Sequence, residues 1–125
     1  MFIHREQFEQ LVNETIDSLP KKFKDKLHNV AIFIEDYPTK QQLKELGIGK
    51  NYTIFGLFEG YAQAKRLNFG PVLPDRITIF RQAILKNCSN IEQCKHQIIS
   101  TVKHEIAHHL GSDEPGARKA SKRHA

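Results

Sequence analysis

Two histidines and a glutamate near the end of the chain have the spacing of a metal-dependent hydrolytic site. His104, Glu105 and His108 form an HExxH sequence, and Gly111 follows three residues after the second histidine. On a helix, side chains four residues apart project side by side, so one metal ion can bridge both imidazoles. Zinc suits two neutral imidazoles with an open coordination position. A carboxylate beside such a site can act as general base on a zinc-activated water that hydrolyses a peptide bond.

The helix that must carry these residues is predicted over residues 90–110, with Ser89 or Asn90 as its N-cap. Successive residues advance by about 100° around an α-helix. Five apolar residues fall within a sector of about 120° and predict the side that faces the core: Ile98, Ile99, Val102, Ile106 and Leu110. His104 and His108 fall about 240–280° around the same wheel, away from this sector.

His109 falls about 20° around the wheel, inside the apolar sector. The sequence therefore predicts a buried histidine with a hydrogen-bonded ring nitrogen. The alternative is that His109 supports the zinc ligands from behind.

The third zinc ligand is expected shortly after Gly111. In HExxHxxGxxH/D sequences it comes three residues after the glycine, which gives Glu114, with Asp113 as the alternative one residue earlier. Both residues could instead decorate a surface turn. Met1 is the only methionine, so the methionine turn of a metzincin is excluded. The short stretch after Gly111 predicts no helix that could supply a glutamate ligand, which disfavours a thermolysin-like arrangement.

The rest of the chain predicts a small sheet with helices around it. Apolar residues at helical spacing and Pro20 predict a helix over residues 5–19. The other expected elements are a buried strand at 29–36, a short helix at 40–46, strands at 52–58 and 76–80, a loop at 61–75 and one helical turn at 81–86. This order predicts an α+β domain with a small mixed β-sheet of about three strands packed on helices.

Size and composition indicate one soluble domain. The chain has 125 residues, of which 39% are hydrophobic and 26% charged. A chain of this length buries a core without metal, so a zinc ion is expected to serve chemistry rather than folding. The N-terminal residues do not resemble a secretory signal, and the apolar run at 30–34 is too short to span a bilayer. A cytoplasmic protein without membrane contact is expected.

The net charge of +5 raises the question of nucleic-acid binding. Basic residues concentrate at 21–26 and in the tail at 118–125, without an aromatic RNA-binding pattern or a zinc finger. A solvated face and a frayed tail are therefore favoured, and nucleic acid is not an expected partner. Cys88 and Cys94 have no common zinc spacing and are interpreted as structural thiols. No feature of the sequence indicates an oligomeric state.

Several blocks of the sequence resemble the bacterial family of minimal zincin-like metallopeptidases. They are Leu19-Pro20, NVAIFIEDYP at 29–38, IFGLFEG at 54–60, LPDRITIFR at 73–81 and VKHEIAHHLG at 102–111. The resemblance implies one zincin-like domain over residues 1–125, with the active helix beside a small mixed sheet. It also implies His104 and His108 as zinc ligands, Glu105 as general base and an acidic third ligand. The family usually has two residues between the glycine and its aspartate, whereas here Ser112 alone precedes Asp113.

The resulting hypothesis is a zinc-dependent metallopeptidase that acts on peptides or exposed protein segments. The alternative is a non-catalytic binding protein on a zincin scaffold, with a weak or empty metal site. A flat surface around His104 would favour that alternative. Zincins commonly hold substrate on a sheet edge, and residues 52–58 are the candidate edge strand. Tyr52, Tyr61 and Arg81 are candidate oxyanion stabilisers, although surface or packing roles are favoured for each.

Overall fold

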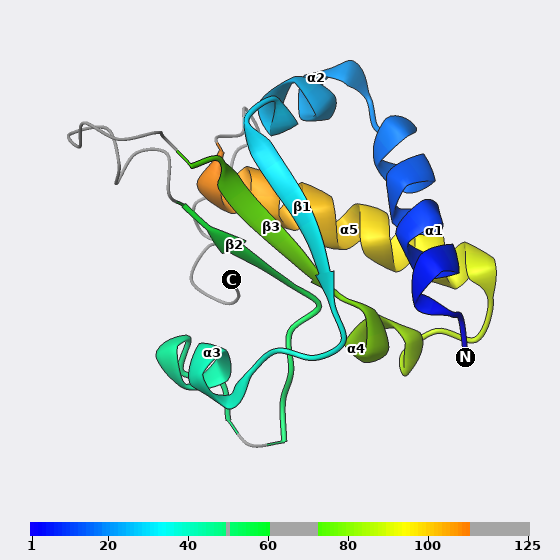
Figure 1. Ribbon diagram of the computed structural model, residues 1–125, viewed down its shortest axis with the longest axis vertical. Helices are drawn as coiled ribbons and strands as arrows, with labels where there is room; N and C mark the ends of the chain where they lie inside the picture. The colour runs from blue at the N-terminus through cyan, green and yellow to red at the C-terminus, as the bar shows by residue number, and fades with distance from the viewer. Residues whose placement is uncertain (50, 61–72, 111–125) are drawn as a thin grey trace.

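The computed structural model describes residues 1–49, 51–60 and 73–110, which form a small α+β fold (Figure 1). The expected fold class, with a three-stranded mixed sheet and a long helix late in the chain, is confirmed. The elements in chain order are α1 (Arg5–Asp17), α2 (Lys21–Lys24), the 3-10 helix η1 (Asp25–Leu27), β1 (Val30–Glu35), α3 (Lys40–Glu45), β2 (Gly56–Glu59), β3 (Asp75–Phe80), α4 (Arg81–Leu85) and α5 (Ile91–His109). The sequence pattern did not predict α2 and η1, which contain the first basic segment.

The sheet has the order β1-β3-β2, so the last strand in the sequence is the central one. β1 runs parallel to β3, with Val30 opposite Asp75, and β2 runs antiparallel to β3, with Gly56 opposite Ile79. Successive side chains of a strand point to opposite faces. Ile77 and Ile79 of β3 therefore share one face, and both are fully buried.

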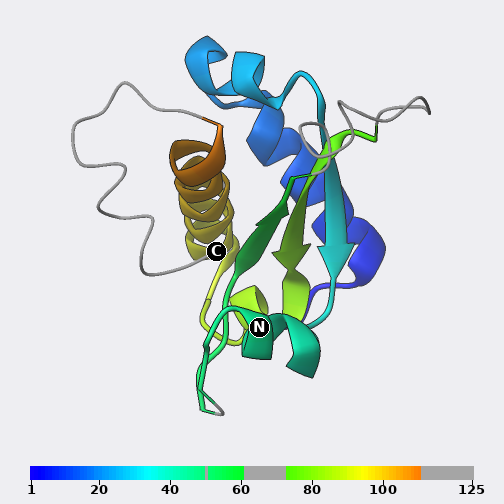
Figure 2. The ribbon, with the colours of Figure 1, turned by 90° about the vertical axis from the view of Figure 1, so that its left-hand side faces the viewer.

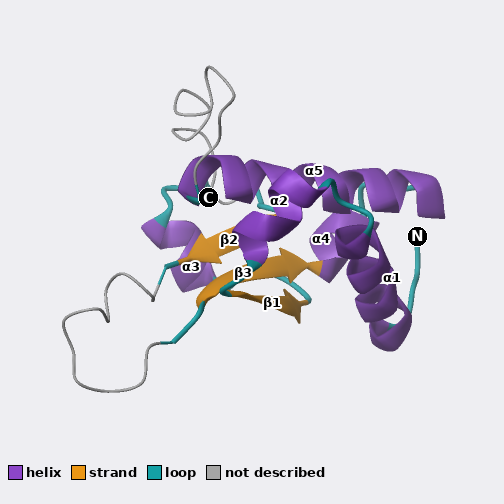
Figure 3. Ribbon diagram, turned by 90° about the horizontal axis from the view of Figure 1, so that it is seen from above, coloured by secondary structure: helices purple, strands orange, loops and turns teal. Residues whose placement is uncertain are grey.

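Helix α5 covers this face of the sheet (Figures 2 and 3). Its apolar residues meet the sheet and α1 in one core, as the helical pattern predicts. Buried members of this core include Phe8 and Val12 of α1, Ile77 and Ile79 of β3, and Ile98, Val102 and Ile106 of α5. Burial of side chains of this size stabilises the fold by about 1.5–3 kcal/mol each.

The opposite face of the sheet is more polar and is organised by Arg76 of β3. The Arg76 guanidinium lies 3.3 Å from the Glu35 carboxylate on β1 and 3.8 Å from the Glu59 carboxylate on β2. It also lies 4.1 Å from the centroid of the Phe33 ring. One side chain of the central strand thus contacts both outer strands.

Arginines also tie the N-terminal segment to β1. Arg5 donates a hydrogen bond to the backbone carbonyl of Ile34 on this edge strand. The Arg81 side chain, 11% exposed, lies with its Nε 3.0 Å from Asp36 Oδ1 and its Nη1 2.5 Å from the Ile3 carbonyl. These contacts give Arg81 the packing role that the sequence favoured over oxyanion stabilisation.

Two predictions about the strands need correction. The strand expected at 52–58 is shorter, because β2 covers only Gly56–Glu59. The Phe80 N–H donates to the Phe55 carbonyl at 2.9 Å, and the chain then turns into α4 at Arg81. No backbone of β3 remains to pair with residues 52–54. The strand expected as buried, β1, is an edge strand, and its Phe33 is 44% exposed.

Cys88 and Cys94 are buried free thiols, in line with their structural interpretation. Burial raises the pKa of Cys94 to about 11, and the neighbouring Cys88 adds to this rise. A thiol with such a pKa holds its proton at neutral pH and is a poor nucleophile.

Within the described ranges, the helices are too short or too polar for any of them to cross a membrane.

Candidate metal centre

Helix α5 begins where the sequence predicts, and its N-cap is Asn90 rather than Ser89. The Asn90 side-chain oxygen accepts a hydrogen bond of 2.9 Å from the backbone N–H of Gln93. This cap satisfies one of the N–H groups that a helix start leaves open. The helix then runs for 19 residues and carries the candidate site in its last two turns.

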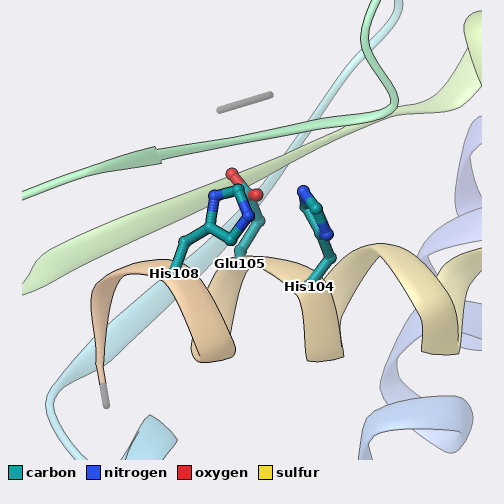
Figure 4. Close-up of side chains that lie close together, drawn as sticks. All are labelled: His104, Glu105 and His108. Carbon is teal, nitrogen blue, oxygen red and sulfur yellow. The ribbon is translucent and has the colours of Figure 1, made fainter. Parts of the chain in front are cut away.

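The HExxH residues lie together on the side of α5 that approaches β2 (Figure 4). Each of His104, Glu105 and His108 offers one ligand atom, and these atoms all lie within 4.8 Å of one another. The ring centroids of His104 and His108 are 3.9 Å apart, as expected for residues one turn apart. The structure thus brings together the three residues that the sequence singled out.

Glu105 is deeply buried, with only 1% of its surface exposed. On the helical wheel it lies about 20° from Ile98, so it shares the direction of the core. Burial raises the pKa of its carboxyl from 4.5 to about 8, while the backbone N–H of Phe58 lowers it in part. Within normal distance and angle limits, neither carboxyl oxygen has a hydrogen-bond partner among the described residues. A buried carboxyl of this kind is costly, which makes Glu105 a candidate functional residue.

The two histidines present nitrogens that are shielded from solvent, namely Nε2 of His104 and both ring nitrogens of His108. Both residues are only half-buried as a whole, in agreement with their position off the apolar stripe. Two imidazoles and a nearby carboxylate in a dry setting are donors that suit zinc. The residues present therefore fit the metal that the sequence implies.

The prediction for His109 was wrong, because this residue is exposed rather than buried. Its ring stacks on the ring of Phe58, with centroids 4.5 Å apart and an interplanar angle of 8°. Partial burial and the neighbouring His108 both lower its pKa. Strand β2 ends beside the last turn of α5, so the ring packs over an aromatic side chain and not inside the core.

A glycine of β2 sets how closely this strand approaches the site. A Cβ at Gly56 would lie 2.5 Å from Cγ2 of Thr101 and 3.8 Å from Cγ of Glu105. Ordinary contacts of a Cβ begin at 3.4 Å, so no other residue fits here without movement. Gly56 and Phe58 share the face of β2 that points toward α5, since they are two residues apart. The strand therefore meets the helix through a glycine at one point and an aromatic stack at the next.

A pocket of about 210 Å³ adjoins the metal centre and was not foreseen from the sequence. We call it the strand–helix pocket, and its lining residues are Thr53, Ile54, Phe55, Gly56, Gln97, Ser100, Thr101, His104 and Glu105. The helix side of this pocket had a detectable pattern, because Gln97, Thr101 and Glu105 follow at intervals of four residues. A glycine inside a predicted strand also indicates close approach of another segment.

Other predicted site residues lie elsewhere. Glu114 and Asp113, the candidate third ligands, lie outside the described residues, as do Tyr61 and the tail at 118–125. Tyr52 is 74% exposed and does not line the strand–helix pocket.

The fold and the site together define a class of protein: a small α+β domain that presents an HExxH helix beside a sheet edge. Residues 27–120 match the model of a family described as zincin-like metallopeptidase. The chain belongs to this zincin-like metallopeptidase family. No curated protein matches the chain at a significant level.

Proposed function

We propose that the protein is a zinc-dependent metallopeptidase that hydrolyses peptide bonds in peptides or exposed protein segments. The observation that carries this proposal is the buried Glu105 carboxyl, held with His104 and His108 so that their ligand atoms lie within 4.8 Å. Membership of the zincin-like metallopeptidase family supports the same reaction class.

In this proposal, His104 and His108 bind the metal as neutral imidazoles. A zinc ion held by these residues would supply a Lewis acid that polarises a carbonyl and lowers the pKa of a water molecule. Glu105 accepts a proton from that water and delivers it to the leaving amine. The positive charge of a metal ion held by the two neutral imidazoles would favour the ionised carboxylate that this base requires. An acidic residue after Gly111, either Glu114 or Asp113, completes the ligand set.

The strand–helix pocket favours hydrolysis over the alternative of a non-catalytic binding protein. A flat surface around His104 would have supported the alternative, but His104 and Glu105 both line a pocket beside residues 53–56. A peptide with a side chain in this pocket would lie against His104 and Glu105, two of the residues that the reaction needs.

The first test is the zinc content of the purified protein and of three variants. We expect about one zinc per chain in the wild type and in E105Q, and none in H104A. A matched control is H96A, because His96 is an exposed histidine on the same helix outside the three-residue group. This control should keep its zinc.

The second test is hydrolysis of a mixed peptide library, followed by mass spectrometry. Wild type and H96A should cleave it, whereas E105Q should retain zinc and lose at least about 100-fold in rate, as expected when a general base is removed. A zinc-loaded wild type that cleaves no peptide would refute the proposal, and so would an E105Q variant with full activity.

A further inference from the structure

The strand–helix pocket lies to one side of the metal centre along α5. Its lining includes His104 and Glu105 but not His108, which lies one turn further along the helix. Gln97, Ser100 and Thr101 extend the pocket toward the start of the helix. A group bound in it would therefore lie beside the reacting atoms without occupying the space between the two imidazoles.

The walls of the pocket are held by hydrogen bonds and packing. The Thr101 hydroxyl donates to the Gln97 carbonyl at 2.7 Å, and Gln97 Nε2 donates to Thr101 Oγ1 at 3.3 Å. On the opposite wall, Ile54 is only 4% exposed. The bond from Phe80 N–H to the Phe55 carbonyl fixes that segment to β3. Such walls form the site before any ligand arrives.

The chemistry of the walls is neutral. Of the described residues that line the pocket, only His104 and Glu105 are titratable. The remainder offer hydroxyl or amide groups (Thr53, Gln97, Ser100) or apolar surface (Ile54, Phe55). Outside the metal centre these walls offer no charge, so a charged side chain placed away from His104 and Glu105 would lose hydration without gaining an opposite charge, which is unfavourable.

The pocket is much larger than a single water molecule or a methyl group. A water molecule accounts for about 30 Å³ of liquid volume, whereas the pocket holds about 210 Å³. It therefore has room for a side chain of the size of leucine, methionine, phenylalanine or glutamine. A methyl group alone would leave most of it unfilled.

We infer that the strand–helix pocket is the specificity site, and that it binds an uncharged, medium-sized side chain of the substrate residue next to the scissile bond. This inference rests on the proposed peptidase function, because a flanking residue has meaning only if a peptide is cleaved. Binding of the side chain itself can be measured without catalysis.

The binding test uses N-acetylated amino-acid amides with ¹⁵N-labelled protein, both metal-free and zinc-loaded. We expect the leucine and glutamine amides to shift the backbone amides of residues 53–56 and 97–101, with dissociation constants on the order of a few millimolar. The aspartate and lysine amides should bind at least about 10-fold more weakly. S100F should abolish these shifts by filling the pocket from an exposed helix position. S89F is the matched control, because Ser89 is exposed and does not line the pocket.

The cleavage test uses a peptide library with each residue type on either side of the scissile bond. Wild type and S89F should prefer uncharged, medium-sized residues at one flanking position by about 10- to 200-fold, the range for fit in such pockets. S100F should prefer glycine or alanine there and still cleave such peptides.

Absence of amide shifts at the pocket residues would overturn the inference, and so would a preference unchanged in S100F. If the amides bind as expected but no peptide is cleaved, the peptidase proposal fails and the inference about flanking residues fails with it. If cleavage occurs without any preference, only the pocket inference fails.

Discussion

Replacement of Gly56 by alanine tests whether β2 and α5 approach as closely as the structure indicates. The new Cβ would lie 2.5 Å from Thr101 Cγ2, whereas ordinary contacts begin at 3.4 Å. Strand and helix must therefore separate by roughly 1 Å, and overpacking of this kind costs about 1–3 kcal/mol. The same movement shifts Glu105, whose Cγ would lie 3.8 Å from the new atom. We expect G56A to be less stable and to bind zinc more weakly than the wild type.

The variant T101S identifies the atom responsible. It removes Cγ2 but keeps the hydroxyl that donates to the Gln97 carbonyl at 2.7 Å. In the double variant, the nearest contact of the new Cβ becomes the Thr78 carbonyl at 3.3 Å, a distance that a shift of a few tenths of an ångström relieves. T101S alone should cost about 1 kcal/mol for the lost methyl group. G56A/T101S should recover most of the stability and zinc affinity lost in G56A.

The assay is a double-mutant cycle by urea denaturation of metal-free protein, repeated as zinc titrations. A coupling energy of at least about 1 kcal/mol between the two positions is expected, because their side chains would meet directly. If G56A costs the same free energy in the T101S background as in the wild type, the Thr101 methyl group is not the obstacle. The reasoning about close approach would then be refuted.

Three further predictions concern single residues. In metal-free protein, the pKa of Glu105 is about 8 in the folded state and 4.5 ordinarily, so the protonated carboxyl stabilises the fold below pH 4.5 and this stabilisation is lost as pH rises toward 8. In urea denaturation, the stability of E105Q relative to wild type should therefore rise by at most about 5 kcal/mol between these two pH values. Parallel pH profiles of stability for the two proteins would contradict this prediction. N90A should lower stability by about 1 kcal/mol through loss of the N-cap, while S89A should not change it. R81K should lose the simultaneous contacts to Asp36 and to the Ile3 carbonyl, and with them at least about 1 kcal/mol of stability. Unchanged zinc binding and peptide cleavage would confirm a packing role, whereas a large loss of turnover would restore Arg81 as an oxyanion stabiliser.

Local pattern predicted the features of α5 that depend on helix geometry alone. The spacing of His104 and His108 predicted that both side chains lie on the same side of the helix, and the structure brings them together. The apolar stripe predicted that Ile98, Val102 and Ile106 face the core, and all three are buried there. The burial of Glu105 also follows from its place on the wheel.

Features that depend on distant segments could not be predicted. The length of β2 is set by where β3 ends and turns at Arg81, and no residue of β2 itself carries that information. The stacking of His109 on Phe58 involves a residue of another element. The strand–helix pocket likewise forms only because residues 53–56 and α5 meet in space.

The strand order has a consequence for synthesis on the ribosome. β3 lies between β1 and β2 in space but follows both in the sequence, so the two outer strands emerge while their common partner is still missing. They do not pair with each other in the finished sheet, and nascent strands with open edges are prone to aggregation. Helix α5 emerges later still and packs on β2 and β3. His104, Glu105 and His108 are therefore brought together only after the three described strands have been synthesised.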